Sequence, residues 1–343
     1  MKKTALFCAF ALKSLCLVAQ DHHFTQFYAA PLQLNPALTG AFDGKYRVGG
    51  VYRDQWRTLL DQPYQTFAFG ADMRFAVNRT ASAKDKIGVG VSFMNDKVNQ
   101  IGFSTTQFGF SGAYHKSLNT LNTQYLSAGF QFGVIQRNVN YDYLTFQSQF
   151  DGETKFDKLS RENLPENNFA FGDLSAGVNY TSAPKGKVGL FVGLAMHHFT
   201  QPNISFYERP DILPNKLFTR YSAQVNVPIP LSRRVTFTPR ILAASQGPHL
   251  EMNLGANIRS VMNTSGTAIH VGGWARPVRN QKSMTLDAVA LLIGVEFNNI
   301  LFGLSYDLNL PTLTNYKKVQ NAFEISIIYL GDYENDELLC PQF

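Results

Sequence analysis

Two adjacent histidine pairs, His22-His23 and His197-His198, are the residues of this sequence best suited to metal chemistry. Imidazole nitrogens are common zinc ligands, so each pair raises the question of a metal site. Neighbouring residues on an extended strand point to opposite faces, which prevents such a pair from holding one ion. The sequence also lacks the Cys/His spacing of a zinc site. We therefore predict no metal and no cofactor.

Other chemical motifs are weak. Gly88-Val89-Gly90 lacks the third glycine and the following helix of a nucleotide-binding loop. Alternating glycines in a barrel strand are instead expected to keep the lumen open or to let the wall bend. No spacing of serine and histidine selects a nucleophile and its base. We therefore predict that the protein is not an enzyme.

Four acidic residues could act as general acids or bases. These candidates are Glu251, Asp287, Asp72 and Glu324. We interpret them as charges inside a barrel, neutralised by arginines. The arginines expected to neutralise them are Arg74, Arg220 and Arg259.

The composition and the first residues indicate a membrane protein made for export. Charged residues are 16% of the 343, aromatic residues are 13%, and mean hydropathy is −0.14. Few charges with average hydropathy are typical of a barrel wall, where lipid-facing and lumen-facing residues alternate. Lys2 and Lys3 followed by an apolar stretch predict a signal peptide at residues 1–19. The net charge of +6 is dispersed, which argues against nucleic acid as a partner.

A period of two, which is typical of strands, dominates the chain after residue 45. Leu250, Met252 and Leu254 alternate with Glu251 and Asn253, so one face is apolar and the other is polar. This pattern fits lipid on one side and a wet lumen on the other. The sequence predicts an all-β, transmembrane, antiparallel up-and-down barrel of about fourteen strands. The expected strands are 46–53, 64–75, 86–95, 103–115, 124–137, 168–180, 187–199, 217–227, 234–245, 250–259, 267–275, 284–297, 300–308 and 321–330.

The strand pattern divides the chain into a barrel at 46–330, a lead-in segment at 20–45 and a tail at 331–343. An even number of strands places both termini in the periplasm, so we name 20–45 a periplasmic lead-in. The longest connections, 138–167 and 200–216, should then lie on the outer side. We expect the protein in the outer membrane, with membrane lipid as one partner.

The lead-in is too apolar for a disordered tail, and Pro31 and Pro36 are expected to exclude both helix and strand. We weigh two interpretations equally: packing into the periplasmic mouth of the lumen, or a docking surface. Its candidate site residues are Gln26, Tyr28, Pro31, Asn35 and Pro36.

Several stretches match the pattern of a known family. Residues 26–40 form an opening motif, and Tyr52–Trp56 with Pro63–Phe67 forms a second one. Ser305–Asp307 and Asn321–Ser326 match the last two strands. Together these stretches resemble the PorP/SprF family of type IX secretion system membrane proteins. Residues 340–343 are similar to the Cys-Pro-x-Phe terminus of that family, with Gln342 where a basic residue is more usual.

This resemblance implies a non-enzymatic barrel that serves type IX secretion or gliding motility. Its expected partners are other type IX secretion components and a secreted adhesin, anchored through the C-terminal domain of that adhesin. The alternative is a channel for a hydrophobic solute, resembling fatty-acid transporters. Adhesin binding would use the outer loops, whose candidate residues are Tyr141, Tyr143, Phe146, Phe150 and Phe156. In the tail, Cys340, Pro341 and Phe343 are expected either to occupy a protected slot or to fray.

Overall fold

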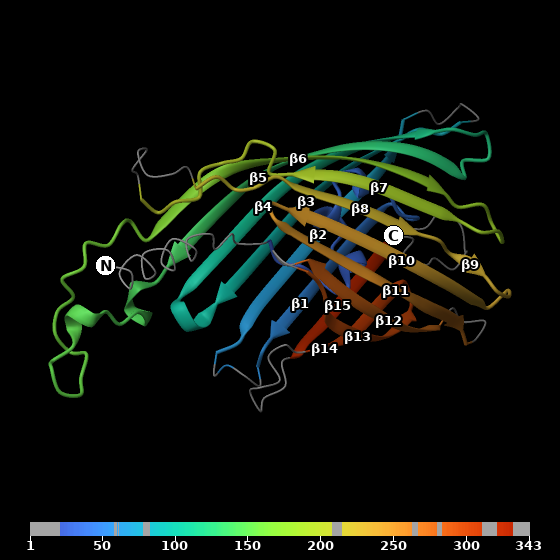
Figure 1. Cartoon of the computed structure of the whole chain (residues 1–343). Coiled ribbons are helices and arrows are strands. Elements are labelled where there is room, and N and C mark those ends of the chain that lie inside the picture. Colours follow the sequence, from blue (N-terminus) through green and yellow to red (C-terminus); the bar gives the residue numbers. More distant parts are fainter. Residues whose placement is uncertain are drawn as a thin grey trace.

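The computed structural model describes residues 21–57, 60, 62–77, 83–207, 215–262, 267–279, 283–310 and 321–331. Antiparallel strands follow one another around a single closed sheet (Figure 1). The ring closes because β15 pairs with β1, and because β10 pairs with both β8 and β11. Among the described residues no helix has the length and apolar character to cross a membrane.

Fourteen of the fifteen strands form the wall, and β9 is a two-residue continuation of β8 along the edge of β10. The prediction of a barrel of about fourteen strands is thus confirmed, with each predicted strand present. The strands are β1 (Tyr46–Gln55), β2 (Tyr64–Ala76), β3 (Lys86–Val98), β4 (Phe103–Ser117), β5 (Gln124–Val139), β6 (Asn168–Ser182), β7 (Leu190–His197), β8 (Arg220–Asn226), β9 (Ile229–Pro230), β10 (Val235–Gln246), β11 (His249–Val261), β12 (Ala268–Arg279), β13 (Met284–Phe297), β14 (Ile300–Asn309) and β15 (Asn321–Gly331).

Successive side chains of each strand point alternately to the inner and outer face of the wall. In β13, Leu291 and Ile293 are 62% and 60% exposed on the outside, whereas Leu292 between them is 3% exposed inside. Large apolar side chains cover the outer face of the other strands in the same way. An apolar outer face of this extent is stable in lipid but not in water.

The two open ends of the barrel differ, and we name them by their connections. The loop mouth carries the long connections between β5 and β6 and between β7 and β8. The turn mouth carries short connections such as Asn298-Asn299, and there β1 begins and β15 ends. The predicted grouping of the longest connections at one end is therefore confirmed. Short 3-10 helices η3 (Asn99–Ile101), η4 (Tyr141–Tyr143) and η5 (Gln147–Gln149) all lie in loop-mouth connections.

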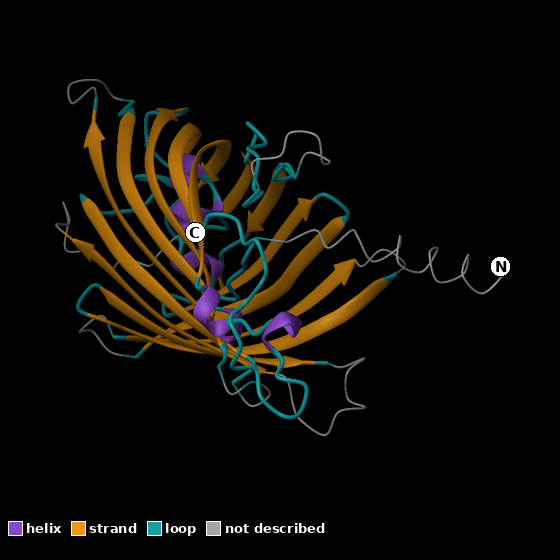
Figure 2. Ribbon diagram, turned by 90° about the vertical axis from the view of Figure 1, so that its left-hand side faces the viewer, coloured by secondary structure: helices purple, strands orange, loops and turns teal. Residues whose placement is uncertain are grey.

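Residues 21–45, which we call the lumenal segment, lie inside the barrel. They contain η1 (Phe27–Ala29), α2 (Pro31–Leu34) and η2 (Pro36–Leu38), and Figure 2 shows helices surrounded by the strands. The expectation that the prolines exclude helix is wrong. Pro31 and Pro36 each occupy the first position of a short helix, where the missing N–H would have had no partner.

The hydrophobic core of the molecule lies between this segment and the wall. Phe27 of the segment packs edge-on against Trp274 of β12, with ring centroids 5.6 Å apart. The expectation of a wet lumen is therefore wrong over this stretch, because apolar residues of the segment fill it. Other members of the core are Phe24, Leu34, Leu38, Phe42, Val51, Met94, Leu242 and Ile328.

Candidate functional site

The lumenal segment runs the whole length of the barrel. At its start, the Asp21 N–H donates to Gln246, the last residue of β10, at the loop mouth. At its end, the Lys45 N–H donates to the carbonyl of Gly331, the last residue of β15, at the turn mouth. The segment thus extends well beyond the packing at one mouth that the sequence suggested.

Close to the start of the lumenal segment, a carboxylate of the wall caps the first helical turn of the segment. Glu324 of β15 accepts hydrogen bonds from the backbone N–H groups of Thr25 and Gln26, at 2.7 and 2.8 Å. These donors precede η1 and have no partner within the segment. The wall therefore supplies the acceptors that an exposed helix would find in water.

Two buried arginines hold this carboxylate and its neighbour Asp307 together. Arg53 of β1 bonds both Glu324 and Asp307, and Arg276 of β12 donates to Asp307 at 2.8 Å. The Thr25 hydroxyl, also in contact with Arg276, donates to Asp307 at 2.7 Å. All five side chains are almost fully buried. Two cations matched to two carboxylates avoid the large cost of an unpaired buried charge.

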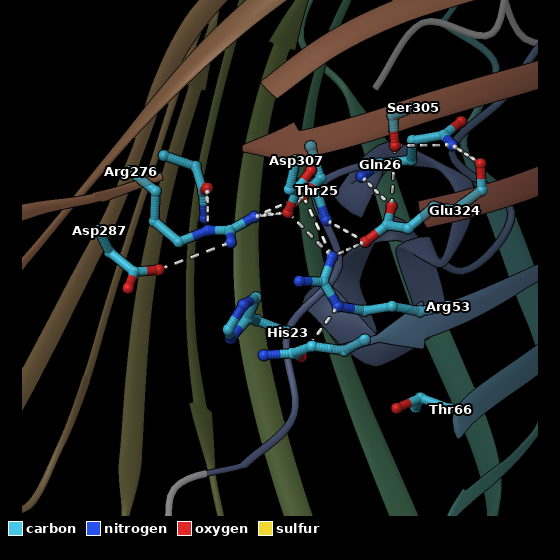
Figure 3. A network of polar contacts seen from close by, with 12 residues as sticks. His23, Thr25, Gln26, Arg53, Thr66, Arg276, Asp287, Ser305, Asp307 and Glu324 are labelled. Carbon is cyan, nitrogen blue, oxygen red and sulfur yellow. Dashed lines mark hydrogen bonds and ion pairs between the residues drawn. The ribbon is translucent and has the colours of Figure 1, made fainter. Parts of the chain in front are cut away.

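Gln26 completes this network, which we call the clamp. The Gln26 amide donates to Ser305 at 3.1 Å and accepts from Ser326 at 2.7 Å. Figure 3 shows these groups converging from β1, β12, β14, β15 and the segment. A Cβ atom at Gly303 would lie 2.4 Å from the Gln26 side-chain oxygen, so glycine leaves room for the hydrogen bonds seen here. The clamp therefore joins sequence stretches that lie about 300 residues apart.

A second contact lies on the opposite wall, where Asn35 reaches β6 and β7. The Asn35 amide donates to the carbonyls of Val178 and Leu194, at 3.2 and 3.3 Å. The Asn35 oxygen accepts from the Ala37 N–H at 2.9 Å and so caps η2. A Cβ atom at Gly177 would lie 2.0 Å from Asn35. Inward glycines therefore admit the segment here, and Gly88 does the same, since a Cβ atom there would lie 2.1 Å from the Thr39 carbonyl oxygen. The expectation that Gly88 keeps the lumen open is wrong.

Toward the turn mouth, wall side chains bind the remaining backbone groups of the segment. Asp72 accepts from the Gly40 N–H at 2.7 Å and is paired with Arg47 at 2.7 Å. His115 contacts the carbonyl of Thr39 at 2.8 Å. Backbone polar groups buried without such partners would cost free energy, so these contacts fix the path of the segment.

At the loop mouth, His198 joins the start of the segment to the wall. It lies 2.8 Å from Asp21 and 2.9 Å from Asp173. Burial lowers the pKa of His198, but the two carboxylates outweigh it and raise the pKa to about 9. The pKa of Asp21 changes in the opposite direction. Burial raises this pKa, but His198 and Arg220 outweigh burial and hold it well below the usual range.

The histidine pair here does not follow the expected alternation. His197 is the last residue of β7 and His198 has a φ of +56°, so both rings turn inward and are buried. His197 contacts Ser175 at 3.1 Å and the carbonyl of Leu34 at 3.2 Å. Both rings border a cavity of about 160 Å³ above the segment. Among the described residues no cluster of three or more His, Cys, Asp or Glu side chains could hold a metal ion.

The acidic residues of the lumen are neutralised, but by partners other than those expected. Asp72 pairs with Arg47, and Glu324 pairs with Arg53. Glu251 lies 3.1 Å from His23, and both line the cavity of about 160 Å³ that His197 and His198 border. Asp287 lies 3.9 Å from Arg276. The predicted arginines bind elsewhere, because two of them meet carboxylates of the lumenal segment and the third meets a carboxylate two strands away. Arg74, Arg220 and Arg259 pair with Asp43, Asp21 and Glu296.

The structure places the five predicted segment residues in the lumen, all of them buried. Gln26 lies in the clamp and Asn35 in the second contact. The guanidinium of Arg240 lies over the Tyr28 ring, 4.9 Å from the centroid of that ring. As placed, the segment is packed inside the wall and is not an exposed docking surface.

The five predicted loop residues lie together in the connection between β5 and β6. Tyr143 and Phe156 are 57% and 47% exposed. Phe150 packs on Phe156 with ring centroids 5.1 Å apart, and the Tyr141 hydroxyl donates to Pro165 at 3.1 Å. The loop thus packs partly on itself and leaves aromatic surface exposed. Cys340, Pro341 and Phe343 lie outside the described residues.

Sequence reasoning missed Thr25, Arg53 and Arg276 as site residues. A signal was available for two members of the clamp, because Asp307 and Glu324 are charges within apolar strands and belong to the stretches that carried the family resemblance. Pairing them with Arg53 and Arg276 required the closed ring, which brings β1 beside β15.

These features define a class: an outer-membrane-type barrel with a polypeptide segment held through its lumen. The model of the type IX secretion system membrane proteins PorP/SprF matches residues 17–329. The chain therefore belongs to the PorP/SprF family, which confirms the expectation from its motifs. Membership associates it with the type IX secretion system and fits the outer membrane.

Solved structures share the fold. The chain is similar to the CymD monoaromatic hydrocarbon channel, with 10% identity over 90% of this chain and 94% of that chain, at a TM-score of 0.52. A deltaS2 mutant of the TodX monoaromatic hydrocarbon channel shows 11% identity over 87% and 92%, at a TM-score of 0.51. At this identity the likeness concerns the fold alone. No curated protein sequence is similar enough to count as a relative.

Proposed function

We propose that this protein is a non-enzymatic docking barrel of the type IX secretion machinery, which anchors a secreted adhesin through the C-terminal domain of that adhesin. Family membership supports the place in secretion. The observation that carries the docking role is the lumenal segment, which is bound to the wall from one mouth to the other. A barrel occupied in this way has its free surface at the mouths.

In this proposal the loop mouth faces the cell exterior, since β1 begins and β15 ends at the turn mouth, on the periplasmic side. Asp21 then lies toward the cell surface. Of the two ends expected in the periplasm, this proposal keeps only the end of β15 there. The exposed rings of Tyr143 and Phe156 would serve as anchors for the client, because aromatic side chains contribute much of the energy of protein interfaces.

The alternative, a channel for a hydrophobic solute, has less support. Such a channel needs an apolar tunnel that leads to a lateral opening in the wall, whereas Phe27, Leu34 and Leu38 fill the lumen between the segment and the wall. The likeness to hydrocarbon channels reflects the shared barrel fold.

Pull-down of the native barrel tests the docking role. We expect a secreted protein, identified by mass spectrometry, to co-purify and its purified C-terminal domain to bind the barrel directly. Replacing Tyr143 and Phe156 together by serine should weaken this binding about tenfold or more. The matched control replaces Leu121, which is 79% exposed at the turn mouth, by serine. Equal binding by both variants would show that the loop does not hold the client.

A further inference from the structure

Within the described residues, β6 has an open strand edge near the loop mouth. β6 pairs with β5 from Asn168 to Ser182, but with β7 only from Ala176 onward. β7 ends at His197, and the chain then turns away. Half of β6 therefore has a neighbouring strand on one side only.

Two hydrogen bonds show which backbone groups face this open side. The Val139 N–H of β5 donates to Asn167 at 2.8 Å, so odd-numbered residues here point to β5. The Phe199 N–H donates to Leu174 at 3.3 Å from the other side, so even-numbered residues point away from β5. In an antiparallel strand the N–H and C=O of one residue point the same way. Ala170 and Gly172 thus direct two donors and two acceptors to the open side.

None of these four groups has a hydrogen-bond partner within the described ranges of the chain. The loop after β7 touches the edge through the Phe199 bond and through Phe206, whose ring packs 4.8 Å from that of Phe169. These contacts leave the backbone of the edge unpaired. Barrels normally close every edge, because an unpaired edge templates pairing with another chain.

We propose that the edge of β6 at Ala170 and Gly172 is a docking site for an extended segment of the secreted client, which adds a strand to the wall. An extended polypeptide is the ligand that fits, since it supplies donors and acceptors with the same two-residue repeat. The outward side chains at the edge are small, and a Cβ atom at Gly172 would meet a single atom, of Phe132, at 3.9 Å. On the inner face, Phe169 and Phe171 offer apolar contact to every second residue of the client.

This inference rests on the proposed docking function and can fail independently of it. Ala170→Pro removes the N–H that faces the open side and places the proline ring there, while the β5 bonds of Phe169 and Phe171 remain. Proline is tolerated on a strand edge. We expect the variant to fold, as judged by its heat-modifiable mobility, and to bind the client C-terminal domain about tenfold more weakly. Ala170→Ser keeps the N–H and should bind as the wild type does.

Cysteine cross-linking gives an independent reading of the same edge. With Ala170→Cys, disulfides should form with every second position of a cysteine scan through the client segment, because strand pairing has a period of two. A double variant with a second cysteine introduced at one of residues 198–207 tests whether the chain's own loop occupies the edge. A disulfide within this double variant that forms in the presence of the client, or a disulfide between two copies of the barrel, would overturn the proposal. The proposal would also be overturned if Ala170→Pro bound the client as strongly as the wild-type barrel does. That result would leave the proposed docking function standing. If the wild-type barrel binds no client, both proposals fail.

Discussion

The two sides of the barrel hold the lumenal segment by different means. On the side of β14, β15 and β1, the clamp binds Thr25 and Gln26 through two carboxylates and two arginines, all almost fully buried. On the side of β6 and β7, the neutral amide of Asn35 bonds two backbone carbonyls. Around the clamp, β14, β15 and β1 are continuously paired and β12 has a β-bulge beside Arg276, whereas β6 has an open edge on the loop-mouth side of Asn35.

This difference shows where the molecule is fixed and where it can adapt. Removing one member of a buried charge cluster leaves its partners unpaired, so the clamp side resists change strongly. A neutral amide contact costs less to break, so the β6 side can rearrange with a smaller penalty. Partner docking is easier to accommodate beside the weaker contact.

The largest effect is expected from Arg53→Met, which leaves Glu324 and Asp307 with one arginine in place of two. We expect the free energy of unfolding to fall by about 3–5 kcal/mol, because an uncompensated charge stays buried. Urea titration of the barrel in lipid vesicles measures the change. The double variant Arg53→Met, Glu324→Gln removes the charge imbalance and should recover much of the loss. No recovery would show that packing, and not charge pairing, makes Arg53 important.

A smaller effect is expected from Asn35→Ala on the opposite wall. Losing the two carbonyl contacts and the cap of η2 should lower the free energy of unfolding by about 1–2 kcal/mol. Asn140→Ala is the matched control, because Asn140 also caps a 3-10 helix but lies exposed in a loop. A loss for Asn35→Ala as large as that for Arg53→Met would remove the contrast between the two sides.

The smallest effect concerns pH at the start of the segment. The His198 pKa is raised to about 9 from 6.5. The stability that protonated His198 gives to the start of the segment is therefore fully present below pH 6.5 and is lost as pH rises through 9. Asp21 stays ionised over this range, since its pKa is lowered. Hydrogen–deuterium exchange at residues 21–24, corrected for the intrinsic rate, should therefore rise across this window.

His198→Gln provides the control for this pH dependence. Its exchange should be faster at neutral pH and should change little between pH 6.5 and 9. A pH profile for this variant like that of the wild type would assign the dependence to a group other than His198.

The wall could be predicted from the sequence because a period of two is a local property. In β11, alternation placed Asn253 on the inner face without any knowledge of neighbouring strands, and Asn253 is buried there. The lumen could not be predicted in the same way. Pairing Glu324 with Arg53 depends on ring closure, and the inward glycines at Gly177 and Gly303 make room for a segment far away in sequence. Prolines at helix starts also misled the prediction for the segment, because Pro31 and Pro36 initiate helices that are stable only inside the wall.

Ion conductance in a planar lipid bilayer tests most directly the claim that the lumen is occupied by its own chain. With the segment bound from Asp21 to Lys45, the wild-type barrel should show no stable conductance steps. A variant lacking residues 21–40 should conduct, provided that its heat-modifiable mobility shows a folded barrel. Stable porin-like steps from the wild-type protein would contradict the account, because they would require an open path where the structure places the core of the molecule.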